Sequence, residues 1–339
     1  MNLINGLTKK MGRELGLVVS LFLMIAVFAA IDPIYLSPGN LLDIVDQSTI
    51  NGLLAIGITF VIITGGIDLS IGSIMAIVIV SVGWFLTKHG MNPFLAIILG
   101  ILLGAVIGIF NGLLVTKFKL QPFIATLATM SAFRGVAYII TNGWPVLDIP
   151  QNYRDMMDGD LVGNFPISIP ILLAFAIISH IILKKTRTGT FVFSIGGNEE
   201  ATRLSGINVD FTKIVTYALC GVGAALAGMV MLARLGTGEP AAGQGYELYA
   251  IAAAAIGGTS LAGGKGSILG TLLGALILSA LKTGLVVVGV DSFWQYIATG
   301  GIIAVAAYFE IIQSKFSGFG KRLFGRRQTD NKADKVQAG

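Results

Sequence analysis

Long apolar stretches alternate with short polar connections along most of the chain. A helix needs about twenty predominantly apolar residues to cross roughly 30 Å of hydrocarbon, and the stretches approach that length. Two pairs of stretches are separated only by the glycine-containing breaks Gly65–Ser70 and Gly257–Ser267, so eight spans is the alternative if either pair forms a re-entrant hairpin. The pattern predicts ten spanning helices, over residues 15–31, 44–64, 70–87, 93–115, 122–140, 166–183, 213–235, 248–262, 267–288 and 292–312.

The composition is that of a membrane protein. Of the 339 residues, 54% are hydrophobic and 12% are charged, whereas a soluble domain carries about 25% charged residues. Backbone that lies in lipid must satisfy its hydrogen bonds internally, as a helix does. We therefore predict an all-α polytopic protein with one membrane domain over residues 15–314, a basic N-terminal segment over 1–14 and a basic, disordered tail over 315–339.

Basic residues are distributed unevenly among the connections. If the N-terminus is cytoplasmic, most of the 23 lysines and arginines fall on the cytoplasmic side, in agreement with the positive-inside rule. The connection over residues 145–165 is then external and acidic, and Trp84, Trp144 and Trp294 lie near the outer interface, where indole rings are enriched. Both termini are therefore expected in the cytoplasm.

No pattern of catalytic or cofactor-binding residues is visible. His89 and His180 stand far apart without neighbouring thiols or carboxylates, so we expect no metal site. Thr259–Gly266 has a superficial likeness to a phosphate-binding loop, but it lacks the required glycine at its start and the required Ser or Thr at its end. We expect this chain to have no enzyme activity, to hold no cofactor and to bind no nucleic acid, so any ATP and Mg²⁺ would be bound by a partner.

The connection over residues 184–213 contains a predicted short helix. Asn198 is suited to cap it, Glu199 and Glu200 complement the positive end of its dipole, and Gly206 is suited to end it. Two interpretations remain open: an amphipathic loop that lies on the membrane, and a docking helix for a cytoplasmic partner.

Three segments carry a family resemblance: TGGIDLSIGS from Thr64, GGNEEATRLSGIN from Gly196, and the long stretch from Pro240 to Leu278. In this order they closely resemble the permeases of ribose-type ABC importers, which also serve xylose, arabinose, galactosides and the autoinducer-2 sugar. The resemblance implies ten helices in two inverted halves, a bacterial inner-membrane location and a homodimer. It also implies two cytoplasmic ATP-binding cassette subunits and an extracytoplasmic sugar-binding protein as partners.

The resemblance implies that the short helix is the coupling helix that enters a groove on the ATPase. The residues expected to act in coupling are Gly197, Asn198, Glu199, Glu200, Arg203, Leu204, Gly206 and Ile207.

Polar residues within apolar segments are costly in lipid and are therefore candidates for a translocation pathway or gate. For Gln47 and Asn51 the alternative is interhelical hydrogen bonding, and for Asp68 it is capping of the following helix. If the halves are inverted repeats, the break at Gly65–Ser70 corresponds to the one at Gly236–Glu247. The candidates are Gln47, Asn51, Thr59, Gly65, Gly66, Asp68, Gln244 and Glu247.

The function predicted from these observations is import of a monosaccharide, with ribose favoured, by alternating access driven by the partner ATPase. A permease of the related branched-chain amino acid importers fits the loop motifs less well. A secondary transporter needs titratable residues at midspan, and most acidic residues lie in loops or at span ends.

Overall fold

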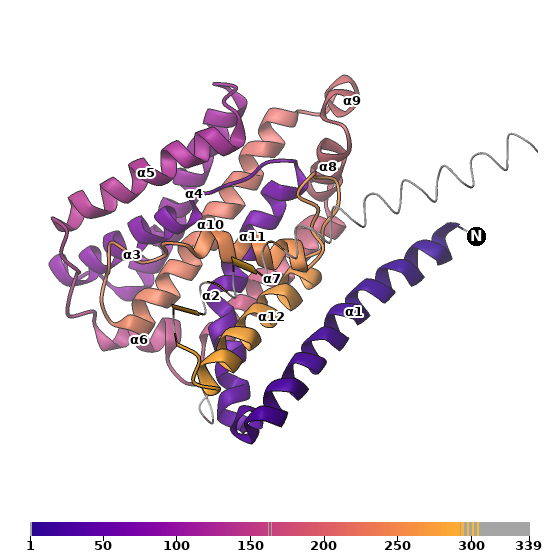
Figure 1. Ribbon diagram of the computed structural model, residues 1–339. Coiled ribbons are helices and arrows are strands. Elements are labelled where there is room, and N and C mark those ends of the chain that lie inside the picture. The colour runs from indigo at the N-terminus through magenta and orange to yellow at the C-terminus, as the bar shows by residue number, and fades with distance from the viewer. Residues whose placement is uncertain are drawn as a thin grey trace, which may run out of the picture. The chain divides into compact units, whose positions relative to one another are not determined.

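The computed structural model describes residues 2–161, 163, 165–291, 293, 294, 297, 300, 301 and 304. Met1–Val290 form one compact unit, and Asp291–Gly339 form a second. Regular structure in the described residues is helical, apart from isolated bridges between Val146 and Gly238 and between Asp160 and Pro166 (Figure 1). The elements are α1 (Asn2–Ile31), η1 (Pro33–Leu36), α2 (Pro38–Ile63), α3 (Ile71–Lys88), α4 (Pro93–Thr116), α5 (Pro122–Thr141), α6 (Gln151–Asp158), α7 (Ser168–Lys185), α8 (Arg187–Gly197), α9 (Glu199–Leu204), α10 (Val209–Leu235), α11 (Tyr246–Ile256) and α12 (Ile268–Val287).

Eight of the described helices are long and apolar enough to cross a membrane: α1 from Glu14 onward, α2, α3, α4, α5, α7, α10 and α12. Three of them begin with proline, at Pro38, Pro93 and Pro122. Proline suits this position because its missing N–H is one that a first helical turn leaves unpaired. An all-helical membrane protein is thus confirmed, and the chain is an integral membrane protein.

Two of the ten predicted spans need comment. The span predicted over 248–262 is wrong: α11 has 11 residues, about 16 Å at 1.5 Å per residue, which is too short to cross roughly 30 Å. The apolar run continues past the helix end through Gly257 and Gly258, so hydropathy alone did not locate that end. The span predicted over 292–312 lies largely outside the described residues.

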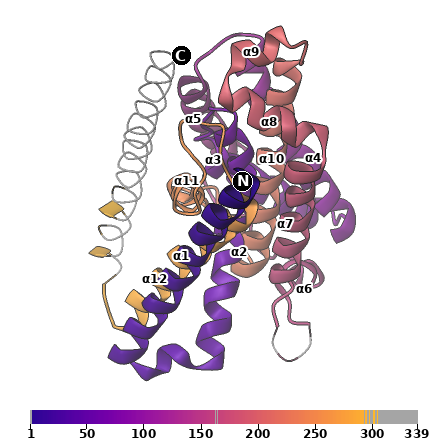
Figure 2. The same cartoon turned by 90° about the vertical axis from the view of Figure 1, so that its right-hand side faces the viewer.

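α10 occupies the centre of the first unit, where it packs against α4, α2 and α3, while α2 also packs against α12 and α11. The apolar window of α2 is 83% buried within the protein and that of α1 is 0% buried, so α2 is a core helix and α1 a peripheral one. α1 contacts α12 around Tyr35, whose hydroxyl donates to the Ala280 carbonyl at 2.6 Å. Figure 2 places α8 and α9 at one end of the bundle and α6 at the other.

Glycines bring α4 and α10 into backbone contact. A Cβ atom on Gly108 would collide with the carbonyl oxygen of Tyr217, and one on Gly221 would collide with the carbonyl oxygen of Gly104. α12 meets α11 in the same way, since a Cβ on Gly274 would collide with the Ala253 carbonyl. The glycines of α4, α10 and α12 therefore allow close backbone contacts, as small residues do between membrane helices.

Candidate functional site

The six-residue helix α9 lies where the sequence predicted a short helix. Asn198 precedes it, and its Oδ1 accepts a hydrogen bond from the backbone N–H of Ala201 at 2.9 Å. Glu199 and Glu200 occupy the first turn, where carboxylates complement the helix dipole. The chain leaves the helix through Gly206, whose φ of +80° favours glycine. The predicted cap, first turn and stop are confirmed.

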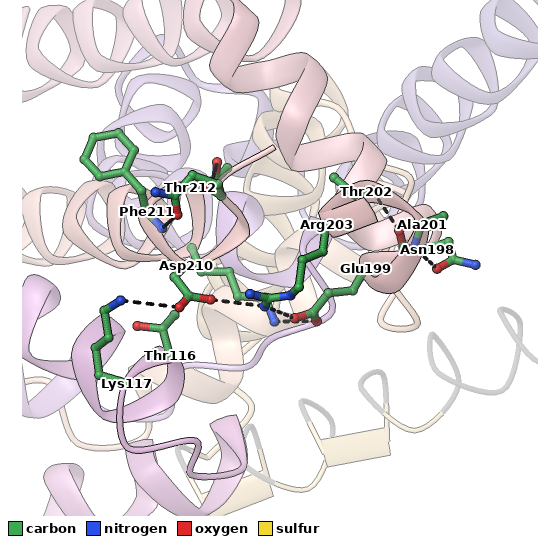
Figure 3. Close-up of polar contacts among 12 residues, drawn as sticks. Thr116, Lys117, Asn198, Glu199, Ala201, Thr202, Arg203, Asp210, Phe211 and Thr212 are labelled. Atoms are coloured by element: carbon green, nitrogen blue, oxygen red, sulfur yellow. Dashed lines mark hydrogen bonds and ion pairs between the residues drawn. The ribbon is translucent and has the colours of Figure 1, made fainter. Parts of the chain in front are cut away.

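Ion pairs join α9 to the start of α10 and the end of α4 (Figure 3). The Glu199 carboxylate accepts from Lys213 Nζ at 2.7 Å and from Arg203 Nη2 at 3.3 Å. Arg203 also donates to Asp210 at 3.1 Å, and Asp210 lies 3.5 Å from Lys117 Nζ. Partial burial raises the pKa of Glu199, but Lys213 and Arg203 lower it by more, so its pKa lies below the ordinary value. The carboxylate of Glu199, one of the residues expected to act in coupling, is thus engaged within the chain.

The outer surface of α9 is open. The Leu204 side chain is 83% exposed, Glu200 and Gly197 are exposed, and Ile207 is half-buried. Leu204 lies outside the spanning helices, and both interpretations of this loop, on the membrane surface or docked to a partner, would cover its side chain. Leu204 and Glu200 are therefore free to contact another protein, and their role in coupling stays a prediction.

α8 ends in a junction made almost entirely of backbone. A Cβ on Gly196 would collide with the Ile63 carbonyl oxygen at the end of α2 and with the Gly264 nitrogen. That nitrogen donates to the Ile63 carbonyl at 2.8 Å. Gly65, with φ +79°, ends α2, and its nitrogen lies 3.1 Å from the Cβ position of Gly263. Any displacement of α8 is therefore passed directly to the end of α2 and to the loop between α11 and α12, called the glycine junction below.

The break between α2 and α3 contains a buried polar cluster. Asp68 is 0% exposed, and its Oδ1 accepts from the Ser70 N–H at 2.9 Å and the Ser70 hydroxyl at 2.6 Å. Ser70 in turn accepts from Asn111 Nδ2 of α4 at 2.7 Å. Asp68 was expected either to cap α3 or to act in a gate. The N-cap residue of α3 is Ser70, so the prediction that Asp68 itself caps α3 is wrong. Gly66 precedes the cluster and packs against Tyr217.

The break between α10 and α11 meets the start of α3. A Cβ on Gly72 would collide with the Gly243 carbonyl oxygen. Arg134 of α5 donates to the carbonyls of Pro240 and Ala242 at 2.7 Å each, and to that of Gly72 at 3.3 Å. Arg134 therefore joins the backbone of the α10–α11 break to the first turn of α3.

Glu247 and Gln244, both gate candidates, lie at the start of α11. Glu247 Oε1 accepts from the Gly245 N–H at 3.2 Å, while Gln244 is exposed. The break between α10 and α11 therefore contacts the first turn of α3, with Glu247 beside Gly72 and the Gln244 side chain on the surface.

The three polar residues of α2 do not form one polar row. Gln47 is exposed, and Asn51 is half-buried with no donor to its Oδ1 among the described residues. Thr59 is fully buried and lies 2.9 Å from the Thr271 hydroxyl of α12. Thr59 therefore has an interhelical contact, whereas the alternatives for Gln47 and Asn51, a pathway role or interhelical hydrogen bonding, stay open.

Sequence reasoning missed one ion-pair cluster at the α6 end of the bundle. Arg234 Nη2 donates to Asp46 at 2.7 Å and to Asp158 at 2.9 Å, and the Ser168 hydroxyl donates to Asp46 at 2.5 Å. An arginine beside an apolar run was the only signal. The partners come from three other elements, so no local spacing identifies them.

Comparisons with known proteins agree with this architecture. The family described as "Branched-chain amino acid transport system / permease component" matches residues 40–307. The ribose import permease protein of Bacillus subtilis (strain 168) is 45% identical over 308 residues, which cover 90% of this chain and 94% of that protein. The ribose import permease protein of Escherichia coli (strain K12) is 42% identical, covering 88% and 94%. The D-allose transport system permease protein of the same organism is 37% identical, covering 87% and 90%.

No solved structure matches the chain. The family match spans most of the residues, and the identity to these relatives extends over nearly their whole length. The chain therefore belongs to this family of transport permeases, with the ribose and allose permeases among its relatives.

Proposed function

We propose that this chain is the membrane-spanning permease of an ATP-binding cassette importer for a monosaccharide, with ribose as the favoured substrate. The observation that carries the proposal is 45% identity to a ribose import permease over 94% of its length. Identity of this kind over the whole membrane domain supports a shared transport role more strongly than any single motif does. The branched-chain amino acid alternative rests on the family description alone.

The proposed assembly has two copies of this chain, two ATP-binding cassette subunits on the cytoplasmic side and a sugar-binding protein on the outer side of the inner membrane. The exposed surface of α9 supports the cytoplasmic part of this proposal. A helix of six residues, about 9 Å long, is too short to be stable alone. Its cap and ion pairs hold it in place, which suits a surface that a partner must find preformed.

Transport proceeds by alternating access in this proposal. Closure of the ATPase subunits displaces α9. The glycine junction passes the movement to α2, the ion pairs of Arg203 and Glu199 pass it to α10, and the pair of Asp210 with Lys117 passes it on to the end of α4. The break between α10 and α11 meets the start of α3 at Gly243 and Gly72, so an interruption of the helices lies inside the bundle. In transporters such interruptions are where substrate binds and gates move.

Leu204→Asp tests the coupling role of α9. The change puts a charge where an apolar groove is expected, and burying an unpaired carboxylate is costly. We expect the variant to reach the membrane but to lose the ATPase subunit, or to keep it without stimulation of hydrolysis by sugar-loaded binding protein. ATPase stimulation in reconstituted vesicles measures this directly.

Leu161→Asp is the matched control, because Leu161 is also exposed, at 52%, and follows α6 at the other end of the bundle. Wild-type stimulation of Leu204→Asp would remove α9 from the mechanism. Uptake of labelled ribose, xylose and allose by a strain that lacks the gene, with and without this chain, identifies the sugar. Absence of all three activities would contradict the substrate class.

A further inference from the structure

A hollow of about 570 Å³ lies beside α9. Its walls come from the end of α4 and the following connection to α5, from α9, and from the start of α10. The connection, residues 117–121, is a second element that faces the same space as α9, and no role has been given to it so far.

The charges in the hollow do not balance. Lys119, Arg203 and Lys213 line it together with two carboxylates, those of Glu199 and Asp210. Both carboxylates are satisfied by Arg203 and Lys213, and Asp210 also has Lys117 nearby. Among the described residues no ion pair includes Lys119. The hollow therefore carries an uncompensated positive charge at its α4–α5 side.

Lys119 is also in an unusual backbone conformation, with φ +56°. Residues other than glycine pay about 1–2 kcal/mol for this region, and such costs are found where the position of a side chain matters. Each of two lining residues has a large exposed apolar neighbour in the sequence: Phe118, which is 70% exposed, precedes Lys119, and Leu204, which is 83% exposed, follows Arg203.

These features fit a protein surface better than a small molecule. Pockets for small ligands bury most of the ligand surface, whereas Lys119, Leu120, Glu199 and Arg203 are themselves exposed. Protein contacts combine apolar anchors with a polar, charged rim. A lysine without an ion pair, together with the exposed Phe118 of the same connection and the exposed Leu204 of α9, matches that arrangement.

We infer that the α4–α5 connection and α9 form a two-sided clamp that receives an acidic side chain of the ATP-binding subunit beside Lys119, with Phe118 and Leu204 packed on the same subunit. The inference rests on the proposed function and adds a second contact element to it. Since Asp210 links Lys117 to Arg203, a partner held in the clamp moves α4, α9 and α10 together.

Lys119→Glu tests the clamp. Reversing the charge places like charges together, and we expect at least roughly tenfold weaker binding of the ATPase subunit at low salt. Lys88→Glu is the matched control: Lys88 is exposed and ends α3, whose Gly83 packs on Val146 near the α6 end of the bundle. Unchanged affinity in Lys119→Glu would overturn the clamp.

Chemical crosslinking gives a second measurement that does not depend on affinity. The single native cysteine, Cys220, is buried, so Lys119→Cys introduces a uniquely accessible thiol. A short thiol-to-amine crosslinker should join Lys119→Cys to the ATPase subunit and should not join Lys88→Cys to it. Crosslinks to lipid amines alone would show that the connection lies on the membrane surface, which overturns the proposal.

Failure of the clamp and failure of the proposed function give different results. If the unmodified chain binds no ATPase subunit and supports no sugar uptake, the proposed function fails. Only the clamp fails if the unmodified chain binds the subunit and Leu204→Asp weakens that binding, while Lys119→Glu leaves the affinity unchanged and Lys119→Cys gives no crosslink to the subunit.

Discussion

Gly108→Ala probes the contact on which the packing of α4 against α10 depends. A Cβ at this position would collide with the Tyr217 carbonyl oxygen, would lie 2.9 Å from the carbonyl carbon and would lie 3.0 Å from the Cα of Ala218. All three atoms belong to backbone, so no side-chain rotation relieves the contact. Carbon atoms pack best at about 3.5–4.0 Å, so the two helices must separate by roughly 0.5–1 Å.

The energetic consequence has two parts of opposite sign. Overpacking of this kind costs about 1–3 kcal/mol, and alanine gains about 1 kcal/mol over glycine in a helix interior. Gly135 of α5 is the matched control, because a Cβ there meets nothing within 4 Å. The helix-propensity gain is common to both variants and cancels between them. Gly108→Ala should therefore be about 1–3 kcal/mol less stable than Gly135→Ala.

The assay is heat-induced unfolding of each purified variant in the same detergent, together with its abundance in the membrane. We expect Gly135→Ala at or above the wild-type midpoint, and Gly108→Ala below the midpoint of Gly135→Ala by about 2 °C for each kcal/mol of their difference. Equal midpoints for the two alanine variants would mean that α4 and α10 do not contact through this glycine, and the reasoning would fail.

Two further predictions concern charge and topology. Asp68→Asn should be assembled and active, because no cation pairs with Asp68 among the described residues, and an amide keeps the acceptor for Ser70 while offering an N–H to the unpaired Oδ1 of Asn111. Asp68→Ala should lower the free energy of unfolding by about 1–3 kcal/mol. Sugar uptake per assembled protein distinguishes a required charge from a required hydrogen bond. Single cysteines at Asp155 and Gly339 should be labelled from opposite sides of the membrane by an impermeant reagent, since Asp155 is exposed and lies in the acidic connection expected outside. Labelling of both from the outside would contradict the orientation.

The features predictable from sequence were those decided by local chemistry. The cap at Asn198, the carboxylates of the next turn and the stop at Gly206 act within one short segment, so the pattern was sufficient to place α9. Glycines four residues apart on one helix indicate a close helix contact, but they do not identify the partner. The partner of Gly108 is Tyr217, 109 positions away in the sequence.

What the sequence left open depends on contacts between distant segments. Three features depend on the folded arrangement. They are the end of α11 within an apolar run, the hydrogen bonds of Arg134 to the α10–α11 break and to the start of α3, and the pairing of Arg234 with Asp46 and Asp158. Residue type showed that each arginine must be satisfied in some way. It did not show by which groups.

Two kinds of contact join α8 and α9 to the rest of the bundle, and they differ in how they respond to ionic strength. The ion pairs of Arg203 lie at the surface, with the arginine side chain 54% exposed, and exposed pairs are weak and screened by salt. The contact of Gly196 with Ile63 and Gly264 is a backbone contact with no room for a methyl group, so ionic strength does not weaken it. A partner that moves α9 therefore acts on α4 and α10 through salt-sensitive links, and on α2 and the α11–α12 loop through a rigid one. Because α2 is the most buried of the spanning helices, the rigid link is the one that reaches the core of the bundle.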